Sequence, residues 1–341
     1  MGRVTQHMQR DRESAISSME QPLQGTQMST RQTMGDDTAL ARAAISRLEF
    51  FRSERPEDVS VTRLGGLTNT VFKVDCNGES YVLRVPGQGT SDYIDRRVEA
   101  VAAREAARVG VSPAVVVADP VSGLMVTEHT PAAPMSAKLF RSVPGAARRT
   151  GETLRRLHTS GAKFDFRFDL FGMIDEYVRV LADHPGQLPP GLTDMLERAE
   201  ELQQALAARP LSLTACHCDL LPENILDAGS RMWLVDWEYS GMGDPMWDLG
   251  DAAVECGLSP KEEQELLAGY FAGVPKPSEH GRIVIYKVLC DLLWTLWGLI
   301  QDANKNTADD FGAYANRRFE RCKAIVADRG FDAHVAAVRQ G

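Results

Sequence analysis

The feature that most constrains this chain is the spacing of three polar residues near its middle. In ACHCDLLPENIL, residues 215–226, Asp219 is followed five positions later by Asn224. The apolar run MWLV then ends on Asp236, which places this carboxylate at the end of an expected buried strand. Each residue alone is typical of a turn or a cap. The ordered set is much harder to explain in that way, and it indicates a polar functional site.

The part of the chain before this motif has the pattern of β-strands. Its runs of β-branched and aromatic residues are bounded by turn residues, and Asn77-Gly78 between two of them is a strong hairpin signal. A helical pattern closed by Gly110 interrupts the strands at 93–110. The expected strands are 59–64, 70–76, 80–85, 114–119 and 123–130.

Helical spacing of apolar residues dominates the rest of the chain, and short strands interrupt it only within 212–240. The expected helices are 145–158, 173–184, 192–209, 260–272, 280–303 and 308–328. The predicted fold class is therefore α+β and bilobal. A β-rich N-lobe with one inserted helix occupies 36–130, and a mainly α-helical C-lobe occupies 131–341.

Composition restricts the functional class. A net charge of −9 argues against a nucleic-acid-binding surface, which has to be basic. The longest apolar run, 288–300, is too short to span a bilayer and contains Asp291. Residues 1–35 lack periodicity and an apolar signal segment, so we expect a disordered extension, followed by a helix behind Asp36 and Asp37. Six cysteines without a signal indicate reduced thiols and a cytoplasmic protein.

Two features of the N-lobe suit the binding of phosphate groups. The turn after the first strand is rich in glycine and small polar residues, namely Gly65, Gly66, Thr68 and Asn69. Glycines let backbone N–H groups approach phosphate oxygens closely, although an ordinary hairpin turn has the same composition. Arg84 in the third strand can bind phosphate and stays charged. Glu99 in the next helix is its expected partner, and the alternative is that both are surface residues.

Phosphoryl transfer also needs metal ligands and a base near the attacking hydroxyl. Asp219 stands where kinase-like enzymes place this base, and Asn224 and Asp236 stand where they place the ligands of Mg²⁺. We expect His217 to shape the loop by hydrogen bonding. The cluster Cys216–Cys218 lacks a second pair of ligands, so we interpret its cysteines as buried fillers rather than a metal site.

Four segments of the chain together resemble the choline/ethanolamine kinase family. They are RLGGLTNTVFKV, YVLRVPG, HCDLLPENIL and LVDWEYSGMGDPMWDLGD, and the likeness runs over residues 60–325. The resemblance implies the bilobal protein-kinase-like fold, with ATP between the lobes and Glu128 beside its adenine. It also implies that Asp219 is the catalytic base and that Asn224 and Asp236 hold Mg²⁺.

The acceptor of this family is a small amino alcohol. A quaternary ammonium has no N–H to donate, so its recognition depends on aromatic faces and negative charge. Trp294 and Trp297 are three apart on an expected helix, and Tyr314 is a third aromatic candidate. Packing in the core is the alternative role for the two tryptophans. The acidic candidates for the same pocket are Glu238, Glu255 and Asp291.

The resemblance thus predicts an ATP- and Mg²⁺-dependent kinase that phosphorylates choline. Ethanolamine, thiamine, an aminoglycoside or another hydroxylated amine is the alternative acceptor on the same fold. A catalytically silent module that binds nucleotide or choline is the alternative of another class. Such a module is expected to have lost one of the three residues Asp219, Asn224 and Asp236, all of which are present. Oligomeric state is left open by the sequence.

Overall fold

The computed structural model describes residues 33–52, 54–55, 58–65, 69–87, 94–184, 188–307 and 309–341. The chain divides into two compact units. The first comprises the chain up to Pro131 together with Val235–Glu238, and the second comprises Ala132–Leu234 and Tyr239–Gly341. The disordered extension predicted over residues 1–35 lies outside the described residues except for its last three, which begin a helix.

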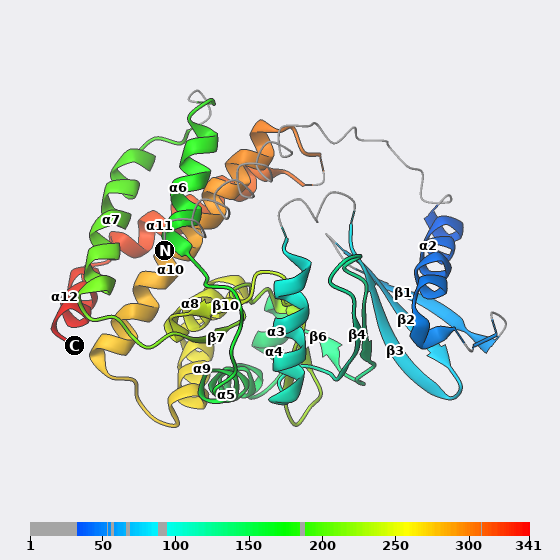
Figure 1. The fold of residues 1–341 in the computed structure, drawn as a ribbon. Helices are drawn as coiled ribbons and strands as arrows, with labels where there is room; N and C mark the ends of the chain where they lie inside the picture. Colours follow the sequence, from blue (N-terminus) through cyan, green and yellow to red (C-terminus); the bar gives the residue numbers. More distant parts are fainter. Residues whose placement is uncertain are drawn as a thin grey trace, which may run out of the picture. The chain divides into compact units, whose positions relative to one another are not determined.

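The first unit is built on an antiparallel five-stranded sheet with the strand order β1-β2-β3-β5-β4 (Figure 1). Asn77 and Gly78 link β2 to β3 with φ angles of 51° and 81°, the left-handed conformations that a two-residue hairpin turn requires. All five strands that the sequence predicts are present. They are β1 (Ser60–Gly65), β2 (Thr70–Cys76), β3 (Glu79–Val85), β4 (Val115–Ala118) and β5 (Met125–Glu128).

Helices α2 (Thr33–Arg47) and α3 (Arg96–Arg108) accompany this sheet, with a short 3₁₀ turn η2 (Glu49–Phe51) after α2. Ala41 and Ala44 of α2, and Leu48 just after this helix, share one apolar core with β2 and β3. The predicted start of α2 behind Asp36 and Asp37 is wrong, because the helix already begins at Thr33 and Asp37 pairs with Arg63. Helix α3 begins at Arg96 because the side chain of Asp95 caps it.

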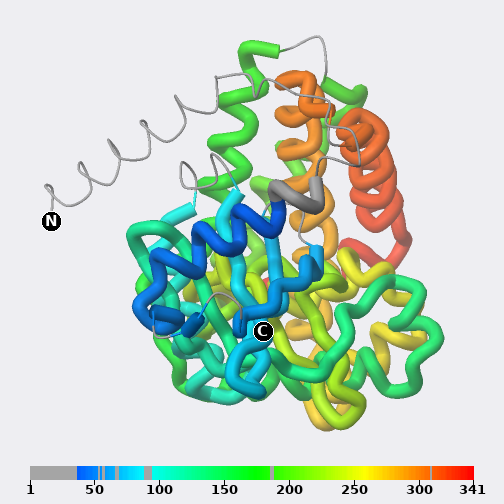
Figure 2. Tube along the Cα trace, turned by 90° about the vertical axis from the view of Figure 1, so that its right-hand side faces the viewer, coloured from blue at the N-terminus to red at the C-terminus, as the bar shows by residue number. Residues whose placement is uncertain are grey.

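The second unit is mainly helical, which confirms the α+β fold class. Its helices are α4 (Ala137–Ser142), α5 (Ala146–Thr159), α6 (Leu170–Leu181), α7 (Leu192–Ala208), α8 (Pro245–Glu255), α9 (Pro260–Phe271), α10 (Pro277–Ala303), α11 (Phe311–Val326) and α12 (Phe331–Gln340). Helix α10 is central, because α6, α8, α11 and α12 all pack against it. Figure 2 shows the last helices of the chain, in orange and red, side by side. The sequence did not predict α4, α8 or α12.

Short strands in the second unit carry the motif region. A three-stranded antiparallel sheet has the order β6-β8-β9, and β7 pairs with β10. These elements are β6 (Ala133–Pro134), β7 (Thr214–Cys216), β8 (Ile225–Asp227), β9 (Met232–Leu234) and β10 (Gly241–Gly243), with a 3₁₀ turn η6 (Pro222–Asn224). Asp219 and Asn224 therefore lie between β7 and β8, and Asp236 follows β9.

Helix α10 corrects one expectation about membrane spanning. The apolar run 288–300 is part of a 27-residue helix that is long and apolar enough to cross a bilayer. Within the most apolar 18-residue window of this helix, however, 83% is buried inside the protein. Burial of this kind is typical of a core helix in a globular fold. The length of the apolar run therefore does not argue against a membrane span, whereas the burial of α10 inside the protein does.

Candidate functional site

A buried ionic cluster in the first unit surrounds Arg84. Its Nη1 atom forms an ion pair with Glu99 of α3 and donates a hydrogen bond of 2.9 Å to Asp236 Oδ1. Glu238 Oε2 lies 4.0 Å from the same nitrogen. The expected pair between Arg84 and Glu99 is therefore present. Burial opposes the charge of Arg84, but its carboxylate neighbours raise its pKa, so the guanidinium stays charged.

Part of the Arg84 guanidinium has no hydrogen-bond partner among the residues that the structure describes. Its Nε and Nη2 atoms are buried and make no hydrogen bond to any described residue. Leaving buried N–H groups unpaired costs free energy, and a guanidinium is well suited to oxygens of an anion. The two free donors therefore fit a phosphate group. This observation supports the predicted phosphate-binding role of Arg84, which stays a prediction.

The glycine-rich turn is described only at its two ends. Gly66 and Thr68 lie outside the described residues. Gly65 has φ of 145°, which favours glycine, and no described residue other than its chain neighbours has an atom within 4 Å of the place where a Cβ would stand. Asn69 is buried, and its Nδ2 donates to Glu238 Oε2 at 3.1 Å.

Glu238 belongs to the first-unit cluster around Arg84. Its predicted place in the acceptor pocket stays a prediction. Burial and the nearby charge of Asp236 raise the pKa of Glu238 to about 7, although Asn69 and Arg84 oppose this shift. Arg96 of α3 lies 3.5 Å from Glu238 Oε2 and 2.8 Å from Glu99 Oε2. Arg96 is not among the residues that the sequence predicts, because nothing in its local pattern separates it from a solvent-exposed helical arginine.

The loop after β7 presents Asp219 and Asn224 in the second unit. Asn224 Nδ2 donates a hydrogen bond of 3.0 Å to the backbone oxygen of Asp219. Because the amide nitrogen is used in this way, Oδ1 is the atom of Asn224 suited to a cation. His217 is fully buried, and its Nδ1 accepts from the backbone N–H of Asp219 at 3.3 Å. This contact agrees with the loop-shaping role expected for His217.

Two carboxylates of helix α8 accept hydrogen bonds from the backbone of this loop. Asp248 Oδ2 accepts from His217 N at 2.8 Å and Oδ1 from Cys218 N at 2.9 Å, while His158 Nε2 lies 2.9 Å from Oδ2. Burial opposes the charge of Asp248, but the hydrogen bond from His158 and the backbone donors lower its pKa. Asp251 Oδ2 accepts from the backbone N–H of Leu220 at 2.6 Å. Sequence analysis missed both aspartates, although DPMWDLGD carries Pro at a helix start as a signal.

The cysteines of the motif are buried and form no disulfide. Burial raises the pKa of both Cys216 and Cys218 well above the usual range, so both are neutral thiols. Cys216 lies near His158 and Asp248 in a group with metal-ligand chemistry, but those two side chains already hydrogen-bond to each other. The interpretation of the two cysteines as apolar fillers fits these contacts.

An aromatic cluster in the second unit contains all three predicted aromatic residues. The rings of Trp294 and Trp297 are 6.0 Å apart, and those of Trp297 and Tyr314 are 5.9 Å apart. A Cβ on Gly298 would come within 2.8 Å of the Tyr314 ring, so this glycine lets α11 approach α10. Tyr239, which the sequence analysis did not select, lies 6.1 Å from Trp294.

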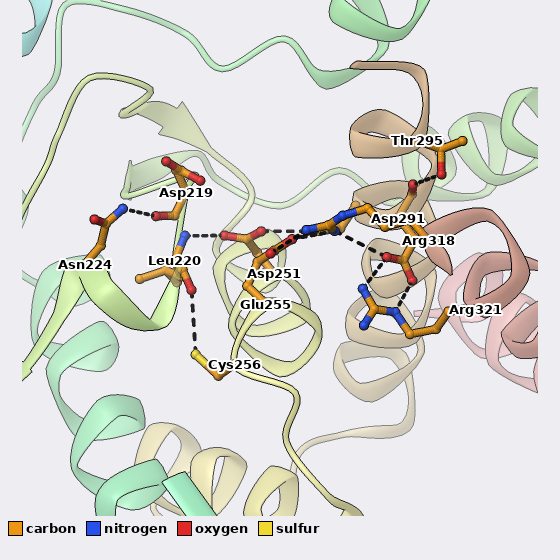
Figure 3. A network of polar contacts seen from close by, with 11 residues as sticks. Asp219, Leu220, Asn224, Asp251, Glu255, Cys256, Asp291, Thr295, Arg318 and Arg321 are labelled. Atoms are coloured by element: carbon orange, nitrogen blue, oxygen red, sulfur yellow. Dashed lines mark hydrogen bonds and ion pairs between the residues drawn. The ribbon is translucent and has the colours of Figure 1, made fainter. Parts of the chain in front are cut away.

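The acidic residues beside this cluster are paired with arginines (Figure 3). Both oxygens of Glu255 accept from Arg318, at 2.7 and 2.6 Å. Asp291 is fully buried and accepts from Arg321. These ion pairs remove most of the negative field that the sequence led us to expect from Glu255 and Asp291. Glu128 is exposed at the end of β5, and its predicted place beside adenine stays a prediction.

Comparisons with known proteins place the chain in a family and a fold. A sequence profile of the phosphotransferase enzyme family matches residues 60–280. The crystal structure of a choline/ethanolamine kinase family protein from Mesorhizobium loti is 51% identical to this chain, with a TM-score of 0.82, and the match covers 89% of this chain and 100% of that one.

Two solved structures of LicA are more distant. The choline kinase LicA from Streptococcus pneumoniae is 26% identical, with a TM-score of 0.69, over 85% of this chain and 98% of that one. A structure of LicA in complex with AMP is 27% identical, with a TM-score of 0.64, over 82% of this chain and 96% of that one.

Proposed function

Because this chain belongs to the phosphotransferase enzyme family, and within it to the choline/ethanolamine kinases, we propose that it transfers the γ-phosphate of ATP to the hydroxyl of choline. The class of reaction follows from the family: it is a kinase whose acceptor is the hydroxyl group of a small amino alcohol. The proposal adds choline as the acceptor, ATP as the donor and Mg²⁺ as the metal ion.

The aromatic cluster is the main support for choline as the acceptor. Trp294, Trp297 and Tyr314 bring three aromatic rings together in the unit that also holds Asp219. Aromatic faces attract a cation that has no N–H to donate. A purely structural cluster explains the packing equally well, but Trp294 Nε1 is a buried donor without a partner among the described residues. A completed core leaves few such donors, so a cluster that receives a ligand with an acceptor oxygen, such as the hydroxyl of choline, fits better.

The remaining roles follow from the chemistry of each side chain. Asp219 would accept the proton of the choline hydroxyl as it attacks phosphorus. Arg84 would bind phosphate oxygens through Nε and Nη2, which make no hydrogen bond to any described residue. The oxygen atoms of Asn224 and Asp236 suit Mg²⁺, which prefers oxygen ligands. When bound, Mg²⁺ neutralises part of the charge on the transferring phosphate.

Release of ADP in the presence of ATP and Mg²⁺ tests the proposal. The acceptors are choline, ethanolamine, thiamine and kanamycin. Asp219→Asn is the inactive control, and Asp194→Asn, on the exposed face of α7, is the matched control. We expect turnover with choline to exceed that with the other acceptors, to fall by at least ~10³-fold in Asp219→Asn and to persist in Asp194→Asn.

Two results would contradict parts of this proposal. Turnover with another acceptor and none with choline would remove choline and leave the kinase. Near-normal turnover by a folded Asp219→Asn variant would remove the role of Asp219 as the base.

A further inference from the structure

The charged residues beside the aromatic cluster balance one another. Glu255 comes from α8, Asp291 from α10, and Arg318 and Arg321 from α11 (Figure 3). Two carboxylates therefore face two guanidinium groups in the second unit. All of these side chains except Arg321 are buried. The group as a whole carries no net charge when every member is ionised.

Every carboxylate oxygen in this group already has a donor. Glu255 Oε1 and Oε2 accept from the two Nη atoms of Arg318, in the bidentate geometry that a guanidinium favours. Asp291 Oδ1 accepts from Arg321 Nη2 at 2.5 Å, and Oδ2 accepts from Arg321 Nε at 2.7 Å. Neither carboxylate therefore has an oxygen free of arginine contacts.

Arg318 also joins this group to the aromatic cluster. Its guanidinium carbon lies 4.7 Å from the centre of the Tyr314 ring, and the Tyr314 ring packs on Trp297. One face of Tyr314 is thus used by a cation of the protein itself. The paired carboxylate of Glu255 is close enough to act on the pKa of Tyr314. Glu255 is therefore near the aromatic cluster, but its charge is already balanced.

Primary and quaternary ammonium groups make different demands on such a pocket. A primary ammonium has three N–H donors and loses strong hydration when it is buried, so it needs oxygen acceptors. A quaternary ammonium needs none, and aromatic faces alone attract it. We propose that Arg318 is a specificity-determining residue: by occupying both oxygens of Glu255, it makes the acceptor pocket select quaternary over primary ammonium alcohols. This inference rests on the proposed function and deepens it.

The ratio of kcat/KM for choline to kcat/KM for ethanolamine measures this role. Arg318→Met keeps a long side chain but releases the carboxylate of Glu255. We expect this variant to lower the ratio ~tenfold, mainly through a lower KM for ethanolamine, with KM for ATP unchanged. Glu255→Gln combined with Arg318→Met removes the released charge, and we expect its ratio to return towards that of the native chain.

Matched variants separate specificity from folding. Arg317→Met changes the exposed neighbour of Arg318 on the same helix and should leave the ratio unchanged. If Arg318→Met does not fold, Arg318→Lys provides the same test, because a single ammonium cannot bind both oxygens of Glu255 in the same way. In that variant we expect a smaller fall in the ratio.

The possible failures are distinguishable. A folded Arg318→Met or Arg318→Lys variant with the native ratio would overturn the role of Arg318 while choline turnover continued. A ratio that stayed low in the double variant would also overturn it, because the free carboxylate would then not be the cause. Absence of choline turnover in the native chain would overturn the proposed function itself.

Discussion

Replacement of Asp248 by Asn should destabilise the protein far more than its near-identical shape suggests. The carboxylate of Asp248 accepts three hydrogen bonds inside the second unit, from the backbone of His217 and Cys218 and from the ring of His158. An amide offers one acceptor oxygen and one NH₂ donor group. In the better of its two orientations, the Asn amide oxygen still accepts hydrogen bonds from His217 and His158. Its NH₂ group then faces the backbone N–H of Cys218, and neither of these two groups can accept.

The magnitude follows from these three contacts. The N–H of Cys218 loses its acceptor while it stays buried, which costs about 1–3 kcal/mol. Each of the two remaining bonds changes from a charged to a neutral acceptor, which costs about 1 kcal/mol apiece. The expected loss is therefore about 3–5 kcal/mol, a large share of the ~5–15 kcal/mol that stabilises a typical domain.

Urea unfolding followed by tryptophan fluorescence measures this loss, because four of the five tryptophans belong to the second unit. Asp332→Asn is the matched control. Its side chain is 86% exposed and pairs with Arg198, so we expect a change below ~0.5 kcal/mol. A loss of less than about 1 kcal/mol in Asp248→Asn would refute the reasoning, because the buried backbone donors would then not depend on this carboxylate.

The remaining predictions concern one residue of each unit. Burial and Asp236 raise the pKa of Glu238 to about 7 from its ordinary value of 4.5, so the folded state favours the protonated form. This contribution to stability is lost as pH rises from about 4.5 through 7. Glu238→Gln should therefore gain stability relative to the native chain, by up to about 3 kcal/mol between pH 4.5 and pH 8 in thermal or urea unfolding, and an unchanged difference would contradict the shift. Trp297→Ala should raise KM for choline at least ~tenfold and leave KM for ATP within about twofold, whereas equal effects on both would indicate core packing.

The elements that the sequence predicts well are those with strong local signals. Asn77-Gly78 allows few alternatives to a tight hairpin, and both residues adopt the expected left-handed conformation. The pair Arg84 and Glu99 was predicted from the order of a strand and the following helix, and it is present. Trp294 and Trp297 share one helix face, so their mutual contact also follows from local spacing.

The features that the sequence did not predict depend on contacts between distant segments. Asp248 is separated from His217 by about 30 residues, and no local pattern shows that its carboxylate accepts backbone bonds from the motif loop. Glu255 looked like a free negative charge because its partner, Arg318, is 63 residues further along the chain. Tertiary pairing of this kind cancels charges that a sequence pattern counts separately.

Among the described residues beyond Pro131, the four residues Val235–Glu238 belong to the first unit and the others to the second. These four residues supply Asp236 and Glu238 to the cluster around Arg84. The first unit is therefore not a continuous segment of the gene. A fragment that ends at Pro131 would contain the sheet and Arg84, but it would lack two of the carboxylates that surround this buried cation. A recombination crossover between two relatives within residues 132–234 would exchange the C-terminal part of the second unit together with Val235–Glu238 of the first unit.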